Sequence, residues 1–243
     1  MHLPVLKNLR AFVLVCLLFP VVLKAQEGMP ATVRPCGSDA LQELWRKDAS
    51  YLERERAINK AILQKQYIRV PGAAVKPPGL VVLPVVFHII NEDPNAYTDA
   101  AIQAALQELN DAYAATGAFS GARTDTKIQF CLAKTAPDGS KTTGIVRTHS
   151  YLSDFDNEME GGDLVALGKW DPARYINIWV VTDIKSEYMQ DFECGTWTRL
   201  KMGGYAGAGG DIVVAGVGVG LLAHEMGHYL NLAHTFANRD CKN

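Results

Sequence analysis

The fold of this chain is decided by the stretch His224-Glu225-Met226-Gly227-His228-Tyr229-Leu230-Asn231-Leu232-Ala233-His234. Residues four apart lie on one face of a helix, so His224 and His228 are expected to point at one metal ion, with Glu225 beside them. His234 is six positions beyond His228 and does not share that face. The chain must therefore turn between them, and Asn231 is the expected turning point, since Asn tolerates the left-handed backbone conformation.

These residue types predict a catalytic zinc site. Three histidines supply three protein ligands, and a catalytic zinc site keeps its fourth position open for water. Zinc lowers the pKa of that water towards neutrality, and Glu225 is predicted to be the general base that takes its proton. The alternative is a purely structural zinc site. Glu225 argues against it, because a structural site has no use for a base beside the metal.

Outward from this stretch, the apolar pattern predicts an α/β fold. The nearly continuous apolar run over residues 81–90 predicts a strand buried on both faces, with His88 as a core residue. Further strands are predicted over residues 126–133, 144–148, 175–182 and 211–215, with Trp179 in the core. Helices are predicted over residues 40–66 (with Ser38 or Asp39 as cap and an apolar face broken near Ser50), over 100–115 behind a Thr98 cap, and over 217–232.

The first 25 residues predict a secretory signal peptide, and hence an extracellular protein. Lys7 and Arg10 precede an apolar run over residues 11–23, and Ala25 supplies a small residue for cleavage. A membrane anchor is the alternative, but the run is shorter than the ~20 residues that span a bilayer. The formal net charge of −2, without a long basic run, gives no reason to expect nucleic acid or a membrane surface as partner.

A segment rich in proline and glycine, residues 70–79, predicts a linker. It separates residues 26–79 from a main domain over residues 80–243. The sequence therefore predicts three parts: the signal, a propeptide-like segment and the domain that holds the three histidines.

The zinc motif, extended to Thr235 and Phe236, resembles that of the pappalysin family within the metzincin zinc metalloproteases. Supporting stretches lie at residues 83–88, 128–133, 144–147, 175–179 and 204–206, and the resemblance covers about residues 31–241. It implies a zinc endopeptidase made as a latent precursor and acting on a protein or peptide substrate. It also implies a metzincin-like upper subdomain: a twisted mixed sheet with a backing helix and an active-site helix. Substrate is expected along the sheet edge, for which we expect residues 211–215.

Arg34-Pro35-Cys36-Gly37 resembles a cysteine switch. That resemblance implies that the Cys36 thiolate fills the fourth zinc position until the propeptide is cut. The alternative is a disulfide, because an exported protein favours oxidised cysteines. The sequence alone does not pair Cys36, Cys131, Cys194 and Cys241.

The chain departs from the family pattern in two places. Asn231 stands where the family usually has Gly. The sequence given also ends nine residues past His234, with no methionine after Met226, so the lower subdomain and its methionine turn are expected to be missing. A second hypothesis is therefore a truncated, non-catalytic zinc-binding relic of such a protease. The family's calcium sites do not carry over, and the acidic run over residues 154–163 favours a solvated loop over a Ca²⁺ site, because EF-hand spacing is missing.

Overall fold

A computed structural model describes residues 36–63, 79–93, 95–122, 124–186 and 200–234. All of them belong to one structural unit, Val33–Asn243. The predicted signal peptide, most of the predicted linker, Cys194 and Cys241 lie outside the described residues. In the described part of the chain, no helix is long and apolar enough to cross a membrane.

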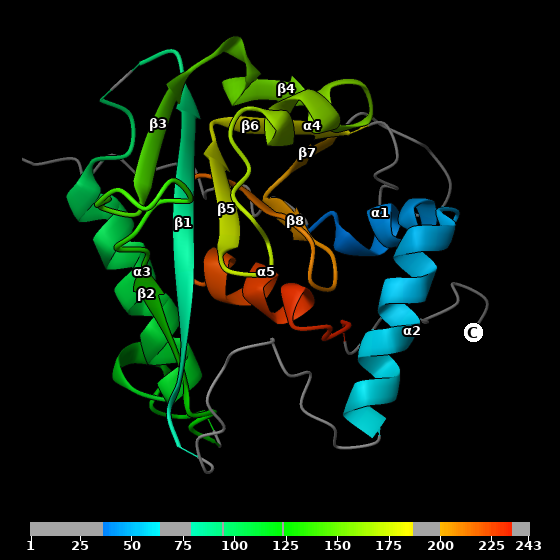
Figure 1. The fold of residues 1–243 in the computed structure, drawn as a ribbon, viewed down its shortest axis with the longest axis vertical. Helices are drawn as coiled ribbons and strands as arrows, with labels where there is room; N and C mark the ends of the chain where they lie inside the picture. Colours follow the sequence, from blue (N-terminus) through cyan, green and yellow to red (C-terminus); the bar gives the residue numbers. More distant parts are fainter. Residues whose placement is uncertain (1–35, 64–78, 94, 123, 187–199, 235–243) are drawn as a thin grey trace, which may run out of the picture. The chain divides into compact units, whose positions relative to one another are not determined.

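A six-stranded sheet forms the centre of the fold (Figure 1). Its order is β2 (Ile128–Leu132), β1 (Val81–Asn91), β5 (Ile176–Val181), β9 (Ile212–Ala215) and β8 (Gly204–Ala206), and β3 (Ile145–His149) also pairs with β1. The long β1 strand pairs with β2 along its first half and with β3 along its second. All pairs are parallel except β8 with β9, and among the described strands β8 ends the sheet on that side.

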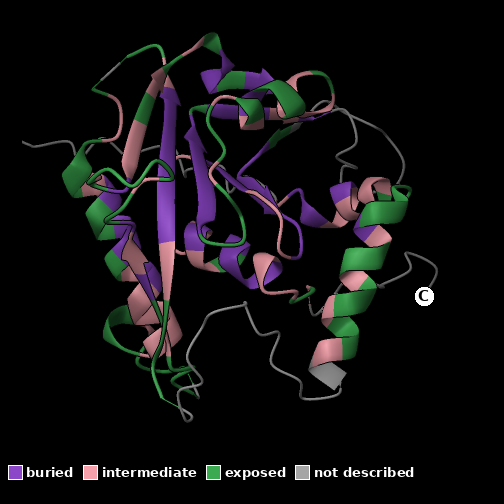
Figure 2. Cartoon of the chain, viewed as in Figure 1, coloured by how far each residue is buried: buried purple, intermediate pink, exposed green. Residues whose placement is uncertain are grey.

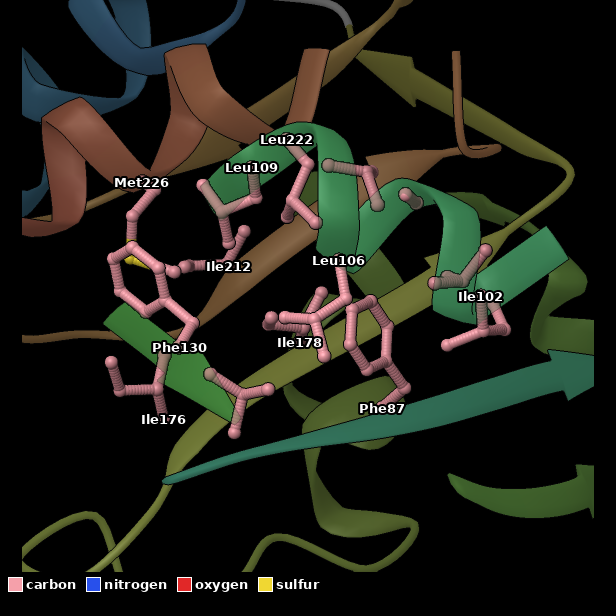
Figure 3. Close-up of a cluster of buried hydrophobic side chains, with 14 of the residues drawn as sticks. Phe87, Ile102, Leu106, Leu109, Phe130, Ile176, Ile178, Ile212, Leu222 and Met226 are labelled. Carbon is pink, nitrogen blue, oxygen red and sulfur yellow. The ribbon is translucent and has the colours of Figure 1, made fainter. Parts of the chain in front are cut away.

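Two helices, α3 (Asp99–Ala114) and α5 (Leu221–Tyr229), pack together with the sheet around the main core. Leu109 of α3 and Met226 of α5 are both buried in it, as is Phe130 of β2 (Figure 3). Burying side chains of this size stabilises the fold by about 1.5–3 kcal/mol each. This packing fixes the rotation of α5 about its axis, because Leu222 and Met226 must both face inward.

The other face of the sheet carries a second, three-stranded sheet of β4 (Asp154–Asp156), β6 (Asp183–Ser186) and β7 (Leu200–Met202). Helix α4 (Asn157–Ala166) follows β4, and two short 3-10 turns lie at Gly117–Phe119 and Tyr151–Ser153. The prediction of a solvated loop over 154–163 is therefore wrong. The Asp156 carboxylate accepts hydrogen bonds from the backbone N–H groups of Glu158 and Met159, both at 3.2 Å, and so caps α4.

The N-terminal segment forms two helices, α1 (Ser38–Trp45) and α2 (Ala49–Leu63), where a single helical stretch was predicted. The Asp48 carboxylate accepts hydrogen bonds from the backbone N–H groups of Ser50 at 2.7 Å and Tyr51 at 3.3 Å. This cap starts a new helix close to the predicted break in the apolar face.

Several local predictions are confirmed. Thr98 caps α3 by accepting a hydrogen bond from the Ala101 N–H at 3.3 Å. His88 and Trp179 are buried, and His88 Nε2 lies 2.9 Å from the side-chain oxygen of Asn177. The strand over 81–90 is buried on both faces only in its second half, and it begins exposed at Val81 (Figure 2). The final helix is shorter than predicted, because it starts after Gly220, which has φ 76°.

Candidate metal centre

Helix α5 presents two of the predicted ligands. His224 and His228 are one turn apart, and their Nε2 atoms lie 3.2 Å from each other. The opposite side of the helix is held in the core by Leu222 and Met226, so the two imidazoles are turned away from the core. Glu225, between them in sequence, is fully buried.

The chain reverses direction directly after α5. Leu230 ends the helix, and Asn231 has φ 70°, in the left-handed region that Asn tolerates. The backbone N–H groups of Asn231 and Leu232 donate to the carbonyls of His228 and Gly227, both at 2.9 Å. This turn brings His234 back towards α5.

The three imidazoles meet at their Nε2 atoms. His234 Nε2 lies 3.0 Å from His224 Nε2 and 3.1 Å from His228 Nε2. Cys36 comes from the opposite end of the described chain, and its Sγ lies 3.5 Å from His228 Nε2. All four ligand atoms lie within 4.8 Å of one another.

This donor set fits a zinc ion. With Zn–N distances of about 2.0–2.1 Å, neighbouring nitrogens of a tetrahedral site lie about 3.3–3.4 Å apart, and a nitrogen and a thiolate sulfur about 3.5–3.6 Å apart. The three separations between nitrogens, and the separation of Cys36 Sγ from His228 Nε2, are within a few tenths of an ångström of these values. A cation also explains why three nitrogens converge, because lone pairs pointed at one another need a positive charge between them.

The protonation of the imidazoles agrees with metal binding. Burial, followed by the neighbouring histidines, lowers the pKa of His224. Burial is also the main cause of the lowered pKa of His228. His228 Nδ1 lies 2.7 Å from the carbonyl oxygen of Leu232, so Nδ1 donates its proton there. Nε2 of neutral His228 is then the unprotonated nitrogen, which is the form a metal requires.

Cys36 reaches this cluster by pairing with the sheet edge. It forms a parallel bridge with Gly204, and the Gly37 N–H donates to the Gly204 carbonyl at 2.9 Å. Ser38 extends the contact, because its hydroxyl accepts from the Ala206 N–H at 3.0 Å. The segment from Cys36 to Ser38 therefore lies along the edge of β8 that does not pair with β9.

The surroundings of Cys36 disfavour its thiolate form unless a cation is bound. Burial, and then the carboxylate of Glu225, raise its pKa to about 12. Without a metal this cysteine is a neutral thiol that donates to Glu225 Oε2 at 3.7 Å. A coordinating metal reverses this preference, because it deprotonates a bound thiol.

Glu225 is the buried carboxylate beside the metal centre. Burial raises its pKa to about 8, although hydrogen bonds from Cys36 and Ser38 lower it in part. The Ser38 hydroxyl lies 3.3 Å from Glu225 Oε2 and 3.2 Å from the Ala206 carbonyl, so its single proton serves one of these acceptors at a time. In the described part of the chain, Oε1 of Glu225 has no hydrogen-bond partner. A perturbed carboxyl group in such a place is typical of a functional site.

The space for Glu225 depends on Gly204. A Cβ atom at position 204 would lie 2.8 Å from the Val213 carbonyl oxygen, 3.0 Å from Glu225 Cγ and 3.1 Å from Glu225 Oε1. A glycine is therefore needed where β8 passes the base.

Two expectations about the surroundings of the site need correction. Residues 211–215 do not form the sheet edge, because β9 pairs with β5 on one side and β8 on the other. Ser38 and Asp39 do not cap α1, whose N-cap is Gly37 without a side-chain hydrogen bond. Their side chains turn to Glu225 and His234 instead. Only the long-range fold brings these groups together, so no local signal in the sequence assigns them this place.

The cysteines of the described residues are both free. Cys36 lies at the metal centre and Cys131 is a half-buried thiol in β2. The predicted disulfide remains a prediction, because Cys194 and Cys241 lie outside the described residues.

Comparisons with known proteins relate this fold to a metalloprotease. A glutamate-to-alanine mutant of promirolysin from Tannerella forsythia is 25% identical, with a TM-score of 0.55, and the match covers 83% of this chain and 70% of that one. Mature Tannerella forsythia mirolysin in complex with a cleaved peptide is 25% identical, with a TM-score of 0.49 and coverage of 69% and 70%. Mirolysin in complex with a compound is also 25% identical, with a TM-score of 0.48 and coverage of 67% of each chain. No protein-family model and no curated protein matches the chain.

The likeness to promirolysin confirms the expected fold, the metzincin-like upper subdomain with a mixed sheet and several helices. It also supports a metalloprotease, since mirolysin is one. The assignment to the pappalysin family is finer than this likeness and stays a prediction.

Proposed function

We propose that the chain is a secreted, zinc-dependent endopeptidase made as a latent precursor, and that it belongs to the pappalysin family. The observation that carries the proposal is the convergence of three imidazole Nε2 atoms and one thiol beside a buried carboxylate. Four ligands alone would also suit a structural zinc site, but such a site has no use for a buried carboxylate beside the metal. The likeness to promirolysin supports the same conclusion.

The proposed ligands are His224, His228 and His234, and the proposed general base is Glu225. A bound zinc supplies a Lewis acid that polarises the scissile carbonyl and activates the attacking water. Glu225 accepts a proton from that water at Oε2 and delivers it to the departing amine. A nearby cation lowers the pKa of a carboxyl group, so a bound zinc would offset part of the rise that burial causes in the pKa of Glu225.

The proposed substrate is a protein or peptide that adds a strand to β8. Peptides bind exposed sheet edges through backbone hydrogen bonds, and β8 offers such groups at Gly204 and Ala206. In the structure these groups are bonded to the segment from Cys36 to Ser38. This segment therefore closes the substrate edge while Cys36 takes the fourth ligand position.

Latency and secretion are proposed from the sequence. The propeptide is proposed to span residues 26–79, after a signal peptide of residues 1–25, and the catalytic domain to begin at residue 80. Release of Cys36 requires a cut after it, and we propose that this cut lies near Arg69, between the helical propeptide and the linker over residues 70–79. A calcium site is not part of the proposal.

The test is a combined zinc and cleavage assay on the unprocessed chain without its signal peptide, residues 26–243. Native mass spectrometry measures bound zinc, and cleavage of casein is followed before and after nicking of the propeptide with trypsin. We expect one zinc per chain, and activity only after nicking. Glu225→Ala should keep the zinc and lose the activity, whereas His224→Ala should lose both.

Two outcomes would contradict the proposal. A chain without zinc would refute the three-histidine site. A chain that holds zinc and stays inactive after nicking would instead support the rival hypothesis of a non-catalytic zinc-binding protein.

A further inference from the structure

Asp39 contacts the third histidine of the metal centre. Its Oδ2 lies 2.7 Å from His234 Nδ1, and the side chain of His234 is only 8% exposed. A carboxylate accepts hydrogen bonds, so Nδ1 of His234 carries the proton and donates it. Nε2 of the same ring, which faces His224 and His228, is then left with its lone pair towards the metal position.

The group that orients His228 comes from a different part of the chain. His228 is oriented by the carbonyl of Leu232, which belongs to the same turn as the ligands. His234 is oriented by a residue in the first turn of α1, 195 positions away in the sequence. Asp39 lies within residues 26–79, the segment proposed to be removed on activation. The proposed ligand His234 is therefore oriented by a residue of the proposed propeptide, Asp39.

We propose that Asp39 is an outer carboxylate of the zinc site in the latent precursor, so that the propeptide strengthens zinc binding as well as blocking the site. This inference rests on the proposed zinc site. A carboxylate bonded to the second nitrogen of a ligand histidine fixes the ring and raises its basicity, and its loss typically weakens metal binding about 10–100-fold. The Asp39 side chain is 43% exposed, so water screens its charge. We therefore expect its hydrogen bond to His234 to contribute more to zinc binding than its charge does.

Removal of the propeptide would change the surroundings of the zinc. The latent chain has both the Cys36 thiol and the Asp39 carboxylate, and the processed chain has neither. Zinc is then bound most tightly before activation. We therefore expect zinc to bind while the precursor folds. Cleavage of the propeptide should then lower the affinity of the site for zinc.

The test measures zinc affinity of the full, unprocessed chain by competition with a chromophoric chelator. Asp39→Asn keeps the shape of the side chain and removes the carboxylate. We expect its zinc dissociation constant to rise by about 10-fold or more. Asp39→Glu restores a carboxylate and should recover part of the loss. Glu43→Gln, on the exposed side of the same helix, removes the same charge and should bind zinc as the wild type does.

Failure of the role of Asp39 and failure of the zinc site give different results in this assay. Equal affinities for Asp39→Asn and Glu43→Gln would overturn the role of Asp39, as would equal losses in Asp39→Asn and Asp39→Glu. If instead the wild type takes up no zinc, or His234→Ala binds it as tightly, the proposed zinc site itself fails. Circular dichroism of each variant checks that the chain remains folded.

Discussion

Gly204→Ala should impair catalysis without removing the metal. The added methyl group would lie 3.0 Å from Glu225 Cγ and 3.1 Å from Oε1, and 2.8 Å from the Val213 carbonyl. The carbonyl belongs to β9, whose pairing with β5 and β8 holds it in place. The contact with this carbonyl forces β8 to shift at position 204, and the contacts with Glu225 force its side chain to move as well.

The size of the effect follows from these contacts. Carbon atoms pack best at about 3.5–4.0 Å, so Glu225 must shift by roughly 0.5 Å or more. A shift of 1 Å in a reacting group costs about 100-fold in rate, which puts the expected loss in kcat at about 10–100-fold. Overpacking should also lower the free energy of unfolding by about 1–3 kcal/mol. Zinc content should not change, because the three atoms nearest to the new methyl group belong to Val213 and Glu225 and not to a ligand histidine.

The assay compares kcat and bound zinc in the nicked wild type, Gly204→Ala and a control. Gly218→Ala is the matched control, because a Cβ at that position meets nothing within 4 Å. It should keep wild-type turnover. The reasoning is refuted if Gly204→Ala turns over substrate as fast as Gly218→Ala.

Two further predictions concern latency and pH. Cys36→Ala should cleave casein without nicking. It should do so more slowly than the nicked enzyme, because Ser38 still contacts Glu225 and β8. An unnicked variant as inactive as the unnicked wild type would contradict the cysteine switch. Burial lowers the pKa of His88, so the folded chain holds it neutral while the unfolded chain protonates it below about 6.5. The free energy of unfolding of the metal-free chain should therefore fall as the pH drops below that value, by up to about 1.4 kcal/mol per pH unit from this group. Denaturant titrations at pH 7.5 and 5.5 should show a smaller drop for His88→Gln, and an equal drop would exclude this histidine as the cause.

The sequence predicted the elements that carry a periodic pattern. The apolar runs became β1 and β5, and the Thr98 cap started α3 as expected. Helix geometry paired His224 with His228, and the tolerance of Asn for the left-handed conformation predicted the turn at Asn231, so the ligands could be proposed before the fold was known.

What the sequence did not predict depends on contacts between distant residues. β8 has three residues in a glycine-rich run, too short to show a pattern, and only its pairing with β9 defines it as a strand. The same pairing moved the sheet edge from residues 211–215 to β8. Ser38 and Asp39 look like ordinary capping residues, and they reach Glu225 and His234 only because Cys36 docks on β8.

The most direct test of the account is X-ray absorption spectroscopy at the zinc edge on the full, unprocessed chain. We predict three nitrogen ligands at about 2.0–2.1 Å and one sulfur at about 2.3 Å, with the sulfur replaced by a light atom in Cys36→Ala. A zinc site without sulfur in the wild type, or one with two or more sulfurs, would contradict the proposal that three histidines hold the metal and Cys36 closes the fourth position.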